Sequence, residues 1–180
     1  MKLDLGGGIY PKKGFTNVDS FSGDVKCDFN IDSLPFEDNS IDEIYSSHCF
    51  EHLSGMGHIL REIIRVCKNG ARVEIRTPHP GHDLGMCPAY MPFEGHKGIF
   101  SEWWWKDCLV HFHKDWSDKG KIIIDSFWHH KSEEYSNHPK NLIPKKFKDL
   151  FDNEKQFGEF SKTYLRNYIQ EFAMIGHIEK

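Results

Sequence analysis

The stretch MKLDLGGG at residues 1–8, followed by FTNVD at residues 15–19, decides the predicted fold. An apolar strand runs into three glycines, and a second short strand ends in the carboxylate of Asp19. Successive glycines let the backbone turn sharply and leave no Cβ between the main chain and a ligand. In a doubly wound sheet, ligands bind outside the carboxyl ends of the strands, where such a turn lies. We therefore predict a nucleoside-cofactor site in which Asp19 accepts hydrogen bonds from ribose hydroxyls.

The residues after the glycines indicate which nucleoside is bound. A dinucleotide fingerprint opens a helix, whose N-terminus neutralises a pyrophosphate. Residues 9–14 (IYPKKG) are too few and too turn-like for a helix, and no Gly-Lys-Ser/Thr triplet of a P-loop follows. A cofactor without phosphates needs no helix dipole, and S-adenosylmethionine meets that condition.

The pattern continues with further strands and helices. Strands are expected at residues 25–31, 41–46, 71–77, 121–127 and 173–178. Apolar residues at helical spacing predict a helix over 59–67, with Lys68-Asn69-Gly70 as its C-cap signal. A second helix is expected from Ser101, a plausible N-cap, to residue 109. Shorter helices are expected around residues 144–151 and 164–172.

The run LDLGGG…NVD…IDEIYSSHCFEHL…ARVEIRTPH, within residues 2–79, resembles class I S-adenosylmethionine-dependent methyltransferases, most of all their type 11-like branch. The resemblance implies an α/β, Rossmann-like, mostly parallel sheet of seven strands. The implied strand order is 3-2-1-4-5-7-6, with the seventh strand antiparallel. A loop should join the first two strands, and residues 1–180 should form a single methyltransferase domain.

The resemblance also assigns site residues. Gly6, Gly7 and Gly8 should contact the methionine moiety through the backbone, Asp19 the ribose, and Asp28 with Phe29 the adenine. The full implied set of residues for binding S-adenosyl-L-methionine is Asp4, Gly6, Gly7, Gly8, Asp19, Asp28, Phe29 and Ser46. His48 and His79 are the candidate catalytic residues because they lie closest to strand ends, and His82 and His96 remain alternatives. A base is needed only if the acceptor must lose a proton.

The acceptor should bind on the same side as the cofactor. Residues 78–98 are rich in proline and glycine, and we place residues 78–120 as a substrate-side insertion. Tyr90, Phe93, Phe100 or one of the tryptophans at 103–105 should form aromatic pocket walls. This mixture favours O- or N-methylation of a small molecule, such as a sugar or specialised metabolite. A protein or RNA methyltransferase and a non-catalytic cofactor-binding accessory subunit are the alternatives.

Composition narrows the classes of partner. A net charge of −4 over 180 residues argues against a nucleic-acid partner, and no stretch is long and apolar enough for a membrane helix. Five cysteines without a C-x-x-C pair indicate reduced thiols and a cytoplasmic enzyme. The twelve histidines lack the paired spacing of a zinc site, so no metal is predicted and His52 is taken as structural. A second subunit is a candidate to close the pocket, which would make the protein a homodimer.

Overall fold

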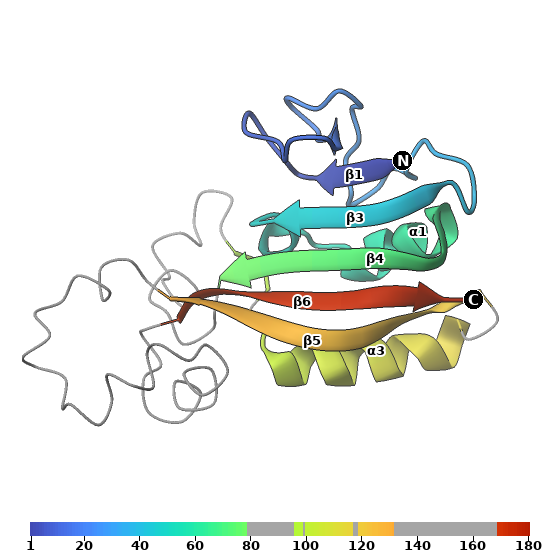
Figure 1. Ribbon diagram of the computed structural model, residues 1–180, viewed down its shortest axis with the longest axis vertical. Coiled ribbons are helices and arrows are strands. Elements are labelled where there is room, and N and C mark those ends of the chain that lie inside the picture. The colour runs from blue at the N-terminus through green and yellow to red at the C-terminus, as the bar shows by residue number, and fades with distance from the viewer. Residues whose placement is uncertain (79–95, 99, 117–118, 132–168) are drawn as a thin grey trace, which may run out of the picture.

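The computed structural model describes residues 1–78, 96–98, 100–116, 119–131 and 169–180. These residues form one six-stranded sheet with the order β2-β1-β3-β4-β6-β5 (Figure 1). The strands are β1 (Lys2–Leu5), β2 (Thr16–Val18), β3 (Ile41–Ser47), β4 (Cys67–Pro78), β5 (Lys121–Lys131) and β6 (Ile169–Glu179). β6 runs antiparallel to both of its neighbours, while β2, β1, β3 and β4 are parallel. The order of these six strands matches the predicted order without its third strand, the last strand is antiparallel as predicted, and residues between β1 and β2 form a loop.

The predicted third strand, residues 25–31, is wrong. Only Val25 pairs with β2, through an isolated parallel bridge to Val18. The chain turns soon afterwards because Asp28 accepts hydrogen bonds from the backbone and side chain of Asn30, and Asp32 accepts one from the backbone of Asp28. Short acidic and amide side chains that bond to nearby backbone compete with a strand ladder. The sheet therefore has six strands where seven were predicted.

Helix α1 (Met56–Val66) buries one stripe of apolar side chains under the sheet. Its buried aliphatic residues are Ile59, Leu60, Ile63, Ile64 and Val66. The helix stops at Val66, and Cys67 is already extended as the first residue of β4. The predicted C-cap at Lys68-Asn69-Gly70 is wrong, because β4 begins at Cys67, four residues before its alternating pattern, and takes these residues into the strand.

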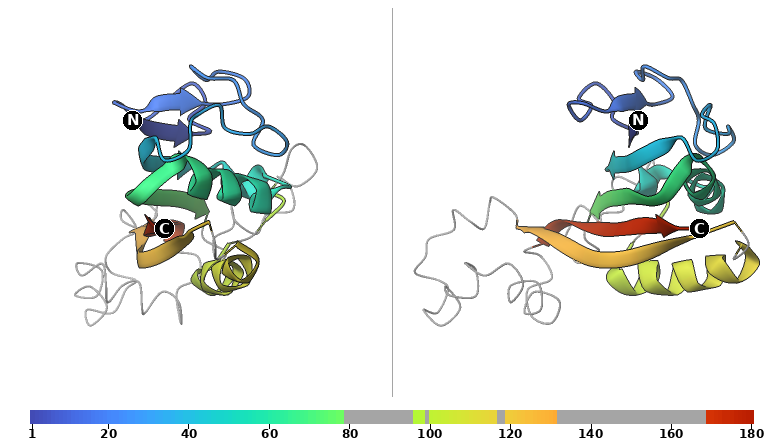
Figure 2. Two further views of the ribbon diagram at one scale, coloured as in Figure 1. Left: turned by 90° about the vertical axis from the view of Figure 1, so that its right-hand side faces the viewer. Right: turned by 45° about the vertical axis from the view of Figure 1, so that its right-hand side comes forward.

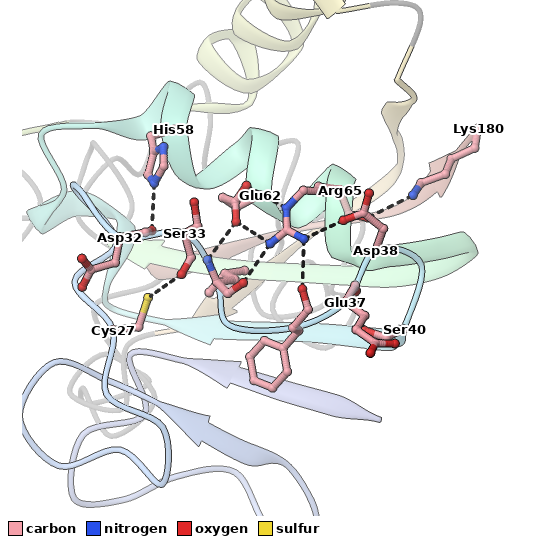
Figure 3. Close-up of polar contacts among 12 residues, drawn as sticks. Cys27, Asp32, Ser33, Glu37, Asp38, Ser40, His58, Glu62, Arg65 and Lys180 are labelled. Carbon is pink, nitrogen blue, oxygen red and sulfur yellow. Dashed lines mark hydrogen bonds and ion pairs between the residues drawn. The ribbon is translucent and has the colours of Figure 1, made fainter.

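Arg65 anchors the turn that precedes β3 to helix α1. Its guanidinium donates to both carboxylate oxygens of Glu62, at 2.9 and 2.7 Å, and to the carbonyls of Phe36 and Leu34, at 2.9 and 2.8 Å (Figure 3). A fifth bond of 2.7 Å reaches Asp38. A planar guanidinium satisfies this many fixed acceptors because its five N–H groups point outward in one plane.

Helix α3 (Glu102–Trp116) begins as predicted, since the Ser101 hydroxyl accepts a hydrogen bond of 3.0 Å from the Trp104 N–H. Trp105 is fully buried, whereas Trp103 is 81% exposed. The tryptophan triplet therefore supplies the core and leaves one ring outside. The short helix predicted around 144–151 lies outside the described residues, and the one around 164–172 is wrong at its end, because residues 169–172 belong to β6.

Both described helices lie on one face of the sheet (Figure 2). Between them and the sheet lies a continuous hydrophobic core that includes Leu3, Leu5, Ile44, Val73 and Ile75. These residues alternate along β1, β3 and β4 with charged or polar residues that face the other side. The alternation of KLDL and ARVEIRT therefore places one face of these strands against the core.

The other face of the sheet carries a chain of ion pairs, some between neighbouring strands and some within β4. Consecutive N···O distances along it are 2.6, 3.1, 2.7, 2.7 and 3.8 Å. Its members in order are Lys2, Glu43, Arg72, Glu74, Arg76 and Glu171. Parallel sheets normally have both faces covered, so a charged face is unusual. Each charge here has an oppositely charged neighbour, which offsets the cost of burial for carboxylates such as Glu74, which is 5% exposed.

Candidate cofactor and acceptor site

The glycine turn after β1 has the backbone that the sequence requires. Gly6 and Gly8 have φ angles of +77° and +55°, and the Gly6 N–H donates a 2.8 Å hydrogen bond to the carbonyl of Val18. A Cβ at Gly6 would lie 2.5 Å from Sγ of Cys49, so only glycine fits between β1 and the segment after β3. A Cβ at Gly8 would meet nothing within 4 Å. The turn is thus packed against protein at Gly6 and open at Gly8.

The side chains of Asp4 and Asn17 pack against the glycine turn and hydrogen-bond to the backbone of the loop that contains it. A Cβ at Gly7 would lie 2.7 Å from oxygens of both side chains. Oδ2 of Asp4 accepts a 2.7 Å hydrogen bond from the Lys12 N–H, and Asn17 donates 2.9 Å to the carbonyl of Gly8. Each side chain is 2% exposed, and Oδ1 of each lacks a hydrogen-bond partner among the described residues. Burial raises the pKa of Asp4, outweighing the bond from Lys12.

Asp19 follows β2 and lies beside the same turn. Its carboxylate accepts hydrogen bonds from the N–H groups of Phe21 at 2.7 Å, Ser22 at 3.0 Å and Gly8 at 3.3 Å. Burial works to raise the pKa of Asp19, but these backbone bonds together lower it, so the group is a carboxylate at neutral pH. The structure therefore places a hydrogen-bond acceptor next to Gly8, and the contact of Asp19 with a ribose stays a prediction.

The remaining predicted cofactor residues differ in what they can offer a ligand. The Phe29 ring is 5% exposed and belongs to the hydrophobic core, which leaves Asp28 as the accessible member of that pair. Ser46 is fully buried, and its hydroxyl donates a 2.7 Å hydrogen bond to the carbonyl of Leu5. Phe29 and Ser46 thus support the strands that carry the turn.

His48 follows β3 directly and has the left-handed φ of +53°. Its Nε2 lies 2.8 Å from a carboxylate oxygen of Glu171, and its Nδ1 lies 3.3 Å from one of Glu51. The bond to Glu171, followed by the contact with Glu51, outweighs burial and raises the pKa of His48 to about 9. At neutral pH the ring is therefore charged, and both of its nitrogens face carboxylates, which suits a donor of hydrogen bonds better than a base.

Sequence reasoning missed three residues in this region: Asn17, Glu51 and Glu171. Asn17 had a local signal, because it precedes Asp19 in the strand that faces the glycine turn. Glu171 had none, since it meets His48 across 123 positions of chain, whereas Glu51 follows His48 by only three residues. His79, His82, Tyr90 and Phe93 lie outside the described residues. Phe100, predicted as a pocket wall, is instead 2% exposed and packs against Trp104 and Trp105 in the core.

Comparison with known families supplies the identity of this arrangement. Residues 15–75 match the family model described as "Methyltransferase domain". This match spans about a third of the chain and shows that this part is similar to a methyltransferase domain. S-adenosyl-L-methionine is the cofactor that this similarity supports. A comparison with curated proteins finds no match.

Solved structures share the fold of this chain at low sequence identity. A SAM-dependent methyltransferase from Archaeoglobus fulgidus has a TM-score of 0.60 and 16% identity, covering 98% of this chain and 85% of that one. The YcgJ protein from Bacillus subtilis has a TM-score of 0.57 and 15% identity, covering 99% and 91%. A chain from the Haloferax volcanii complex of the Trm112 methyltransferase activator with a methyltransferase has a TM-score of 0.57 and 15% identity, covering 99% and 82%.

The residues at the glycine turn fit the cofactor. The methionine end of S-adenosylmethionine carries an ammonium group, and Oδ1 of Asp4 and of Asn17 are buried acceptors without a partner in the described structure. A carboxylate that stays ionised, Asp19, is available to the ribose hydroxyls. Within the described residues, no helix has the length and apolar character needed to cross a membrane.

Proposed function

We propose that this methyltransferase transfers the methyl group of S-adenosyl-L-methionine to an oxygen or nitrogen of a small-molecule acceptor. The observation that carries the proposal is the corner formed by the open Gly8, the ionised Asp19 and the buried, unpartnered oxygens of Asp4 and Asn17. A sugar or specialised metabolite is the proposed class of acceptor.

The protein contributes mainly alignment. The bound cofactor supplies a methyl group on an electrophilic sulfonium, so the chain need only hold donor and acceptor in line. Asp19 would bind the ribose hydroxyls, and Asp4 with Asn17 would bind the ammonium group. Asp28 would reach the adenine from the surface.

The acceptor would enter where β3 and β4 end, beside His48. The charged ring of His48 would donate a hydrogen bond to an oxygen of the methyl acceptor, which would replace one of the two carboxylates that His48 contacts. His79 stays a second candidate for a catalytic role. A methyl acceptor that must lose a proton would need a general base, whereas a neutral amine would not.

A macromolecular acceptor is the second candidate. One similar structure is a complex with the Trm112 methyltransferase activator, which is a property of that protein. Against this reading, the arginines of the charged sheet face, Arg72 and Arg76, are each paired with a glutamate and offer little net positive charge to a polyanion. The non-catalytic accessory subunit is the third alternative.

Calorimetric titration with S-adenosylmethionine tests the cofactor half. Replacement Asp19→Ala removes a charged hydrogen-bond acceptor, a loss of about 1.5–3 kcal/mol, and should weaken binding by roughly 10- to 100-fold. Asp19→Asn, which keeps one acceptor oxygen, should weaken it less. Asp125→Ala is the matched control, because Asp125 pairs with His177 on the far strands of the sheet. Equal affinity in Asp19→Ala and Asp125→Ala would remove the ribose assignment.

Incubation with methyl-labelled S-adenosylmethionine tests the acceptor half. A fractionated metabolite extract and a macromolecular fraction of protein and RNA would be supplied separately. Label in a small molecule supports the proposal, and label only in the macromolecular fraction supports the second candidate. Cofactor binding without any labelled product in either fraction would favour an accessory role.

A further inference from the structure

We propose that Glu51, His52 and His96 form a binding site for a divalent first-row transition-metal ion such as Zn²⁺. One ligand atom from each residue lies within 4.8 Å of the others. Two imidazoles and a carboxylate bind zinc and its neighbours in the first transition row in preference to magnesium or calcium. The proposal concerns metal binding alone and does not depend on the identity of the methyl acceptor.

The fold holds the two ligand-bearing segments together through their backbones. Glu51 and His52 belong to the 3-10 helix η1 (Phe50–His52), while His96 lies beyond the end of β4. The N–H groups of Lys97 and Gly98 both donate to the carbonyl of Glu51, at 2.6 and 3.2 Å. The rings of His52 and His96 meet edge to face with centroids 5.0 Å apart. The donors are therefore assembled before any ion binds.

The buried carboxylate of Glu51 is a second observation, separate from the clustering of the three residues, that points to a bound cation. Glu51 is 1% exposed, and neither of its carboxylate oxygens has a hydrogen bond within the described structure. Oε1 lies 3.3 Å from Nδ1 of the charged His48 ring, which forms an ion pair with Glu51. A buried carboxylate without hydrogen bonds is costly, and a cation coordinated by it would offset that cost.

Three protein ligands would leave coordination positions open, as in metal sites that also bind a substrate or water. The site lies close to the cofactor corner, since Cys49, two residues before Glu51, is the residue that packs against Gly6. An ion here would therefore sit on the acceptor side of the glycine turn, next to His48.

Titration of the metal-stripped full chain with Zn²⁺ by calorimetry tests the site. We expect one ion per chain, with affinity reduced about 100-fold or more in His52→Gln and in His96→Gln, because the loss of a direct ligand costs at least as much as loss of its supporting shell. Glu51→Gln should behave alike. The matched control is His111→Gln, since His111 is an exposed histidine on α3 that pairs with Asp107.

Cysteines are the main competing ligands, so Co²⁺ absorption is the second measurement. A nitrogen and oxygen site should give weak visible bands without the intense thiolate charge-transfer band. Thermal melts should show that His52→Gln, which alters an exposed side chain, leaves the fold intact. The proposal is overturned if the wild-type chain binds no ion, if His52→Gln and His96→Gln bind as tightly as His111→Gln, or if thiolate bands dominate.

Discussion

Replacement of Gly6 by alanine should destabilise this protein well beyond the same change at Gly8. Both glycines have positive φ, at +77° and +55°, so an alanine at either position pays the steric cost of the left-handed region. That cost is about 1–2 kcal/mol. The two sites differ in their surroundings, because a Cβ at Gly6 meets Cys49 and a Cβ at Gly8 meets open space.

The contact with Cys49 sets the additional cost. The new Cβ would lie 2.5 Å from Sγ and 2.6 Å from Cβ of Cys49, which forces the segment after β3 away from β1. Overpacking of this kind costs about 1–3 kcal/mol. Gly8→Ala should therefore lose about 1–2 kcal/mol and Gly6→Ala about 2–5 kcal/mol, a large part of a typical unfolding free energy of about 5–15 kcal/mol.

Urea unfolding of the two variants measures this difference, with a constant slope confirming that only stability has changed. Cys49→Gly removes both clashing atoms, so the cost of Gly6→Ala should fall toward that of Gly8→Ala in this background. Equal losses for Gly6→Ala and Gly8→Ala, or no relief from Cys49→Gly, would refute the close approach of the glycine turn to Cys49.

Three further predictions concern single side chains. The pKa of His48 rises from 6.5 to about 9 on folding. The stability that its carboxylate contacts contribute should therefore be complete below pH 6.5 and be lost as the pH rises through about 9. Denaturation measured from pH 6 to 10 should show this loss in the wild type and not in His48→Gln. Arg65→Lys cannot satisfy the acceptors of the turn before β3 and should lower the unfolding free energy by about 2 kcal/mol in urea, whereas an unchanged midpoint would count against the anchoring role. Ser101→Ala should cost about 1 kcal/mol by removing the N-cap of α3, and Ser101→Asp should restore most of it in thermal melts.

Much of the cofactor half was predictable because its signals are local. Three glycines after an apolar strand allow a positive-φ turn that other residues rarely adopt, and an acid that ends the next strand lies at the same edge of a parallel sheet. Asp19 and Gly8 accordingly meet at 3.3 Å. The third strand could not be judged in the same way, because Asp28 and Asp32 divert the chain through side-chain bonds that compete closely with a strand ladder.

The sequence by itself determined the glycine turn, the acid beside it and the alternation along β3 and β4, since each depends on residues close together in the chain. Only the tertiary structure decided that Glu171 meets His48 and that Glu51 meets His96. Glu171 reaches His48 because β6 inserts antiparallel beside β4, which pairs Glu171 with the end of that strand. Contacts of this kind depend on strand order and register, which arise from packing of the whole sheet rather than from any local pattern.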